Sequence, residues 1–175
     1  MIPCSTPTTT TTAAVIAAVW AVHRHPHGQA WVAEWTPVRA FHTPRRALAA
    51  ASDGRYVYVI GGVDPRGRYV KEVEYARILA DGRLGPWRAT AALATGRFYL
   101  AAVYLDGYLY ALGGGTGPLG SDNTPTAAVE RAKVNPDGSL QPWRQEAYMN
   151  FPRRGLKAVA YRRHIYAVGG YDGQL

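Results

Sequence analysis

Three histidines at alternate positions come nearest to a metal site in this chain. His23, His25 and His27 would share one face of a β-strand, and imidazole nitrogens bind Zn²⁺ or Cu²⁺. Pro26 interrupts such a strand, and no further ligand stands nearby in the sequence. The segment also aligns with an Asn-Pro-Asp-Gly turn further along the chain. We therefore expect a turn here and no metal site.

The carboxylates that could serve in acid–base catalysis stand in turn sequences. Each of four aspartates directly precedes a glycine, namely Asp53, Asp81, Asp106 and Asp137. This pairing is typical of tight turns. The single cysteine, Cys4, can form neither an intramolecular disulfide nor a cysteine-based metal cluster. Gly113–Gly120 is rich in glycine but lacks the Lys-Ser/Thr ending of a phosphate-binding loop. We expect no catalytic residue and no cofactor.

Two loops of unequal length carry the side chains best suited to bind a ligand. The loops are Val63–Lys71 and Gly115–Thr126. The candidate ligand-binding residues are Asp64, Arg66 and Arg68 in the first loop, and Ser121, Asp122 and Asn123 in the second. The first set suits an acidic ligand, and the second suits a polar ligand such as a glycan. A solvated connection without a ligand is the alternative for both loops.

A repeat positions these loops. The segments YVYVIGG, YLYALGG and HIYAVGG occupy Tyr56–Gly62, Tyr108–Gly114 and His164–Gly170. Their central glycines lie 52 and 56 residues apart, and a tryptophan and then an arginine precede each of them at fixed distances. The tryptophans are Trp35, Trp87 and Trp143, and the arginines are Arg45, Arg97 and Arg153. A period of this length indicates stacked supersecondary units.

Each unit has the pattern of four strands. The first two strands are apolar on both faces, and an Asp-Gly turn joins them, which predicts strands buried between neighbouring layers. The third strand alternates more, and a second Asp-Gly turn leads to the fourth strand near the tryptophan. We expect an all-β fold, a partial β-propeller of four-stranded antiparallel blades packed face to face. The repeated arginine is a candidate partner for the repeated Glu74 and Glu130, and a solvated arginine is the alternative.

The repeat resembles the kelch repeat, in the variety found in bacterial proteins. The resemblance rests on the double glycine, the downstream glutamate, the DGRLGPW and DGSLQPW endings at Asp81–Trp87 and Asp137–Trp143, and the arginine that opens the next unit. It implies a propeller of roughly six or seven blades that serves as a binding scaffold. Some kelch-fold proteins are enzymes, among them the galactose-oxidase-like proteins and the sialic-acid epimerases.

The repeat divides the chain into parts. We predict a disordered Thr-rich tail at 1–12, outer strands of a degenerate preceding blade at 13–42, kelch blades at 43–93 and 96–149, and the first half of a further, truncated blade at 150–175. About two full blades cannot close a ring, because a propeller needs about four or more. We expect a fragment of a longer propeller. Self-association is the alternative.

Net charge and hydropathy limit the partners and the cellular location that we expect for this chain. The net charge of +8 comes mostly from arginines that are scattered along the chain, so we expect no nucleic-acid partner. The apolar stretch Ala13–Val22 is too short to span a membrane, although its length fits a signal peptide. The compartment, secreted or cytoplasmic, stays open. We predict a binding module for a protein or a carbohydrate. The alternative is the N-terminal part of a kelch-fold enzyme that acts on sugars, with its active site in missing blades.

Overall fold

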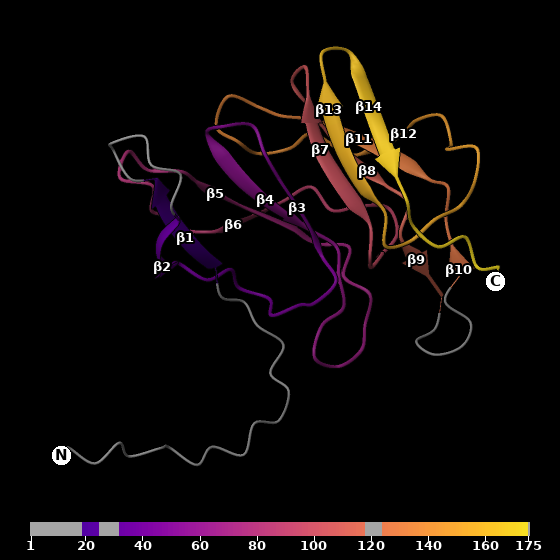
Figure 1. Ribbon diagram of the computed structural model, residues 1–175, viewed down its shortest axis with the longest axis horizontal. Helices are drawn as coiled ribbons and strands as arrows, with labels where there is room; N and C mark the ends of the chain where they lie inside the picture. The colour runs from indigo at the N-terminus through magenta and orange to yellow at the C-terminus, as the bar shows by residue number, and fades with distance from the viewer. Residues whose placement is uncertain (1–18, 25–31, 118–123, 175) are drawn as a thin grey trace.

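The computed structural model describes residues 19–24, 32–117 and 124–174, and Figure 1 shows them as a row of twisted β-sheets. None of these ranges contains a helix. Strand-forming Val, Tyr and Ile alternate here with Gly-containing turns, which favours extended structure throughout. The predicted all-β fold of partial propeller blades is confirmed.

The first four-stranded sheet, called blade 1, is antiparallel and has the strand order β3-β4-β5-β6. Its strands are β3 (Ala49–Ser52), β4 (Tyr56–Ile60), β5 (Val73–Arg77) and β6 (Arg88–Thr90). Strand β4 is apolar on both faces because blade 1 lies between two other sheets. The register places Tyr58 opposite Tyr75, and their rings stack at 6.0 Å.

The second four-stranded sheet, blade 2, repeats this order as β7-β8-β11-β12. Its strands are β7 (Ala101–Leu105), β8 (Tyr108–Leu112), β11 (Val129–Lys133) and β12 (Arg144–Gln145). Asp106 and Gly107 join the first two strands with φ of 48° and 85°. This is the left-handed backbone that a two-residue hairpin turn needs, and it explains the Asp-Gly sequence.

Two-stranded sheets flank the blades on either side (Figure 1). They are β1 (Val19–Arg24) with β2 (Val32–Val38), and β13 (Lys157–Tyr161) with β14 (His164–Val168). A small ribbon of β9 (Gly115–Thr116) and β10 (Thr124–Pro125) lies within the connection from β8 to β11. The sequence predicted a flexible loop there, and the ladder of two residue pairs is a difference from that expectation.

Apolar side chains fill the space between each pair of neighbouring sheets. Tyr58, Ile60 and Leu109 are 0% exposed between blades 1 and 2. Trp87 is 4% exposed on the other side of blade 1, where it packs edge-on against Phe41 with ring centroids 5.7 Å apart. The indole N–H of Trp87 donates to the Arg39 carbonyl at 2.8 Å. The repeated tryptophan therefore ties blade 1 to the chain that precedes it.

The glycine pair at the end of the second strand lets neighbouring blades approach closely. Gly61 and Gly62 have φ of 67° and 103°, and a Cβ on Gly61 would lie 2.6 Å from the Arg97 carbonyl oxygen. Gly62 N–H donates to that same oxygen at 2.8 Å. Both reasons for glycine, the left-handed backbone and the close contact, hold at this position.

The blades have two distinct ends. We call the end that carries the connections 61–72 and 113–128 the loop end, and the end that carries the Asp-Gly turns the turn end. The turn between β13 and β14 points upward in Figure 1 and marks the turn end. The innermost strands β3, β7 and β13 lie side by side along the row. Variation in loop length falls at the loop end, so this is where a ligand-binding surface is expected.

Candidate binding surface at the loop end

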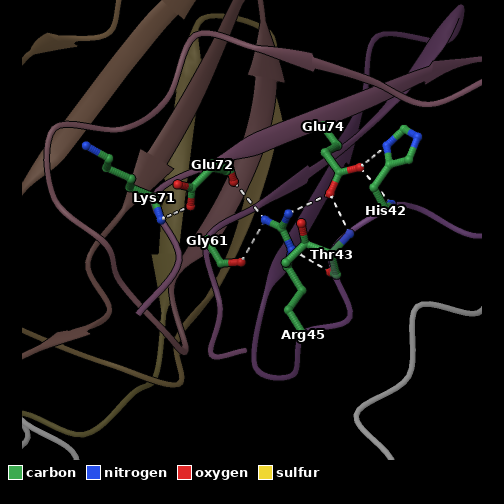
Figure 2. A network of polar contacts seen from close by, with 7 residues as sticks. All are labelled: His42, Thr43, Arg45, Gly61, Lys71, Glu72 and Glu74. Carbon is green, nitrogen blue, oxygen red and sulfur yellow. Dashed lines mark hydrogen bonds and ion pairs between the residues drawn. The ribbon is translucent and has the colours of Figure 1, made fainter. Parts of the chain in front are cut away.

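A buried ion pair lies beneath the loop end of blade 1 (Figure 2). The side chains of Arg45 and Glu74 are 0% and 5% exposed, and Arg45 Nη2 donates to Glu74 Oε1 at 2.7 Å. Arg45 also donates to the backbone carbonyls of Thr43, Gly61 and Glu72 at 3.1, 3.3 and 2.7 Å. The arginine thus links the start of β3, the glycine pair and the start of β5.

The Glu74 carboxylate accepts further hydrogen bonds from the preceding segment. The backbone N–H groups of His42 and Thr43 donate at 2.8 and 3.1 Å, and His42 Nδ1 lies 2.8 Å away. Burial alone would raise the pKa of Glu74, but these hydrogen bonds and the Arg45 charge outweigh burial and hold it below its ordinary range. The carboxylate therefore stays ionised and acts as a structural anchor.

Blade 2 contains the same arrangement at the equivalent positions. Arg97 Nη2 donates to Glu130 Oε1 at 2.8 Å, and Arg97 Nη1 donates to the carbonyls of Gly113 and Ala128 at 2.9 and 3.1 Å. The Arg97 and Glu130 side chains are 1% and 6% exposed. The pairing that the repeat indicated is thus present in both complete blades, and its burial makes it part of the scaffold.

The first candidate loop folds around the Asp64 side chain. Asp64 Oδ1 accepts from the backbone N–H groups of Arg66 and Arg68, both at 2.9 Å. Asp64 Oδ2 accepts from Arg68 Nε and Nη2, both at 2.7 Å. Asp64 is 5% exposed, so its carboxylate is committed to the loop. Burial would raise the pKa of Asp64, but the Arg68 and Arg66 hydrogen bonds outweigh it and lower the pKa.

The three candidates in this loop therefore have different environments. Asp64 is buried, and Arg68 is exposed but paired with it. Arg66 is exposed, and its guanidinium has no hydrogen bond or ion pair with any residue that the structure describes. A hollow of ≈ 300 Å³ adjoins the loop. It is lined by Thr43, Asp64, Arg68, Tyr69, Val70, Lys71 and Glu72.

The second candidate set, Ser121, Asp122 and Asn123, lies outside the described residues. The chain on either side of it is described, and the β9–β10 ribbon joins Gly115–Thr116 to Thr124–Pro125 at the loop end. The ribbon therefore fixes where this loop leaves and re-enters blade 2. The ligand-binding role of these three residues stays a prediction.

Sequence reasoning missed a hollow of ≈ 250 Å³ near the turn end. It is lined by Tyr56, Tyr75, Arg77, Leu79, Gly85, Pro86, Arg88 and Asp137. Arg77 and Arg88 come together because the β5–β6 hairpin reverses the chain between them. The Asp81-Gly82 turn predicted that reversal. The sequence pattern therefore contained enough information to place both arginines on neighbouring strands.

The described residues contain neither a cluster of metal ligands nor a membrane-spanning helix. Among the described residues, no three His, Cys, Asp or Glu side chains gather as a metal site would require. His23 lies in β1, whereas His25 and His27 fall outside the described ranges. Within those ranges no segment forms a helix of the length and hydropathy that crossing a membrane requires.

Comparisons with known proteins identify the repeat. No family model matches the chain. Beta-scruin of Limulus polyphemus is 28% identical over 141 residues, which cover 79% of this chain and 15% of that protein. An F-box/kelch-repeat protein of Arabidopsis thaliana is 31% identical over 80 residues, or 46% of this chain and 17% of that protein. Kelch-like ECH-associated protein 1B of Danio rerio is 37% identical over 90 residues, or 51% of this chain and 14% of that protein.

A solved structure supports the same assignment at the level of the fold. The structure of YjhT, a kelch-type propeller, has a TM-score of 0.64 and 14% sequence identity, and the match covers 79% of this chain and 42% of that chain. This chain spans less than a fifth of the length of the curated relatives that it matches. The resemblance to the kelch repeat is confirmed by these relatives together with the blades of the structure.

Proposed function

Starting from a chain made of kelch-type repeats, we propose that it is an interaction module that binds an acidic segment of a partner protein at its loop end. The observation that carries this proposal is the loop folded around Asp64 by hydrogen bonds, which leaves the Arg66 side chain exposed. A loop that is already ordered loses little conformational entropy on binding, and an arginine fork suits carboxylates.

The charge around the loop supports an acidic ligand. Arg46, Arg66 and Lys71 are exposed at the loop end, and Figure 2 shows the Lys71 side chain extending away from the buried network. Arg46 is bridged to Val63, directly before Asp64, so it lies beside the loop. Exposed cations of this kind steer acidic partners and give binding that weakens with salt.

A protein partner is favoured over a carbohydrate by what the relatives are called. One relative is named as ECH-associated, and the names of the other two relatives mention no carbohydrate. Carbohydrate binding through the second loop, and the alternative of a sugar-acting enzyme, stay predictions of the sequence.

The test uses a fluorescein-labelled octaglutamate peptide as the probe and anisotropy as the readout. We expect Arg66→Glu to weaken binding at least tenfold, because it places a carboxylate where the ligand's carboxylates dock. Arg163→Glu makes the same charge change at an exposed turn-end position, so its effect should be small. Equal losses in the two variants would mean that net charge alone binds the peptide, and the proposed site would then be wrong.

A further inference from the structure

One face of the β13–β14 hairpin is exposed to solvent and carries four large apolar side chains together with Lys157 and His164. The four apolar side chains and their exposed fractions are Val159 (59%), Tyr161 (59%), Tyr166 (49%) and Val168 (57%). The opposite face, which includes Ala158 and Ile165, packs against blade 2. The hairpin, yellow in Figure 1, therefore has one covered face and one uncovered face among the described residues.

The equivalent faces of the two complete blades are covered. Tyr58 and Ile60 of blade 1, which correspond to Tyr166 and Val168, are both 0% exposed against blade 2. Leu112 of blade 2 is 4% exposed against the β13–β14 hairpin. The repeat thus indicates what covers such a face, namely the next blade in the row.

Strands β14 and β1 each lack a neighbour that the equivalent strands of the complete blades have, and their free edges are complementary. Strand β14 pairs only with β13 and strand β1 only with β2, whereas β4, β5, β8 and β11 each have two neighbours in the described sheets. The hairpin supplies the inner strands of a blade. The sheet of β1 and β2 has the same register as the outer strands β5 and β6 of blade 1. Trp20 lies opposite Pro37, and Glu74 lies opposite Ala89 at the equivalent positions of the repeat.

We propose that two copies of this chain associate so that β14 of one copy pairs antiparallel with β1 of the other. The two hairpins then form one complete four-stranded blade. We give this junction the register that β4 has with β5 and β8 has with β11. Val168 then lies opposite Val19 of the second copy, and Tyr166 lies opposite Ala21. The exposed face of the hairpin covers blade 1 of the second copy.

Backbone groups at the junction fit this arrangement. Gly62 and Gly114 donate their N–H groups to the carbonyls of Arg97 and Arg153 in the next unit, both at 2.8 Å. Gly170 has the same left-handed backbone, with φ of 98°, and in the dimer it donates to Arg45 of the second copy. The Tyr58 hydroxyl donates to the Gly138 carbonyl of the next blade at 2.9 Å, so Tyr166 is placed to donate to Gly82 of the second copy.

The number of strands allows this association to close. Among the described residues, two four-stranded blades and two half blades amount to three blades, so two copies of this segment supply six. A two-fold axis along the channel makes the two junctions identical, and neither β14 nor β1 then keeps a free edge. The match of 79% of this chain to 42% of YjhT also means that one chain corresponds to about half of that propeller.

The composite blade differs from the complete blades in one respect. Trp20 stands at the register position of Glu74, so Arg153 gains no carboxylate from the second copy. Arg153 keeps its hydrogen bond to the Gly169 carbonyl at 2.9 Å. The association therefore depends on strand pairing and apolar burial, and it does not depend on the loop-end ligand.

Cysteine cross-linking tests the register of the junction. In a Cys4→Ser background, Tyr166→Cys combined with Ala21→Cys places two thiols on directly opposed residues, where a disulfide can form. We expect mild oxidation to give a reducible band at twice the 19.1 kDa mass of the chain. Tyr161→Cys with Ala21→Cys is the off-register control and should cross-link poorly. Equal cross-linking of the two pairs, or none with the first pair, would overturn the proposal.

Light scattering tests the association itself. We expect the unmodified chain to be a dimer across a dilution series and Val168→Glu to be a folded monomer, since Val168 is exposed in the single chain. Tyr148→Glu changes a residue that is 66% exposed and belongs to neither strand of the hairpin, and it should remain dimeric. A monomeric unmodified chain, or open-ended polymers in place of a dimer, would contradict the proposed closure.

Discussion

Glu74 shows why the repeat keeps a charged pair inside a stack of β-sheets. Its carboxylate accepts from two backbone N–H groups, from His42 and from Arg45, and Arg45 in turn satisfies three carbonyls. The pair therefore satisfies backbone groups where the strands begin and end, which would otherwise be buried without partners. At the loop end, where the strand ladders stop, the hydrogen bonds of Arg45 and Glu74 take the place of hydrogen bonds between strands.

Removing the Glu74 charge should therefore be costly. Glu74→Gln leaves Arg45 buried without its counter-charge, and we expect a loss of about 3–5 kcal/mol in the free energy of unfolding. Urea titration measures this loss. Asp81→Asn is the matched control, because Asp81 pairs with Arg83 at the exposed turn end and its loss should change stability little. Equal effects of the two substitutions would contradict the structural role of Glu74.

The same network predicts how stability depends on pH. Glu74 and Asp64 have pKa values below their ordinary values of 4.5 and 3.8 in the folded chain. Groups of this kind contribute fully above the ordinary pKa, and their contribution is lost as the pH falls through the folded-state pKa. We expect the melting temperature to fall steeply below pH 4.5, and the fall should be shallower in Glu74→Gln. Parallel pH profiles would contradict this assignment.

The sequence predicted the site only in part at the residue scale. The recurrence of arginine and glutamate in every complete unit indicated that the two could pair, but it did not indicate that the pairs would be buried. It could not tell that Asp64 binds Arg68, because that contact depends on the turn at Gly67, which has φ of 81°.

At the scale of the strands, sequence and structure agree where apolar residues fall on both faces and Asp-Gly marks a turn. The strands of the complete blades have these signals. The β9–β10 ribbon has neither of them, because it is held by two residue pairs in a loop of small and polar residues. Its formation depends on the closeness of the loop's two ends, which the blade imposes and local sequence does not encode.

The glycine pair gives a direct test of blade packing. Gly61→Ala brings a Cβ to 2.6 Å from the Arg97 carbonyl, whereas a Cβ on Gly54 meets nothing within 4 Å. Both glycines have positive φ, so each alanine costs about 1–2 kcal/mol from the backbone alone. We expect Gly61→Ala to destabilise the chain clearly more than Gly54→Ala in thermal unfolding. Equal losses would mean that the blades do not approach as closely as described.

The repeated tryptophan provides a second test of packing between sheets. Trp87→Ala removes a ring that is 4% exposed and leaves the Arg39 carbonyl without its donor, so we expect a loss of about 3–5 kcal/mol. Tyr148→Ala removes an aromatic ring that is 66% exposed and should cost little. Chemical denaturation followed by circular dichroism compares the two. A small effect of Trp87→Ala would contradict its place between the sheets.

At the scale of the whole molecule, the main contacts between the described sheets are those between neighbours in the row. Stability then depends on the intrinsic stability of each blade and on each interface, as in other repeat proteins. The sequence predicted this architecture because the repeat is regular. It also predicted outer strands at 13–42 and the first half of a blade at 150–175, but the register between β1 and β2 comes from the structure.

The most direct test of the functional account is hydrogen exchange followed by mass spectrometry, with and without the octaglutamate peptide. The account predicts slower exchange in the segment 62–72, where the loop around Asp64 exposes Arg66. Exchange at the turn end, including the hollow lined by Arg77 and Arg88, should stay unchanged. Protection centred on the turn end, or none at the loop end despite saturating peptide, would contradict the assignment of binding to the loop end.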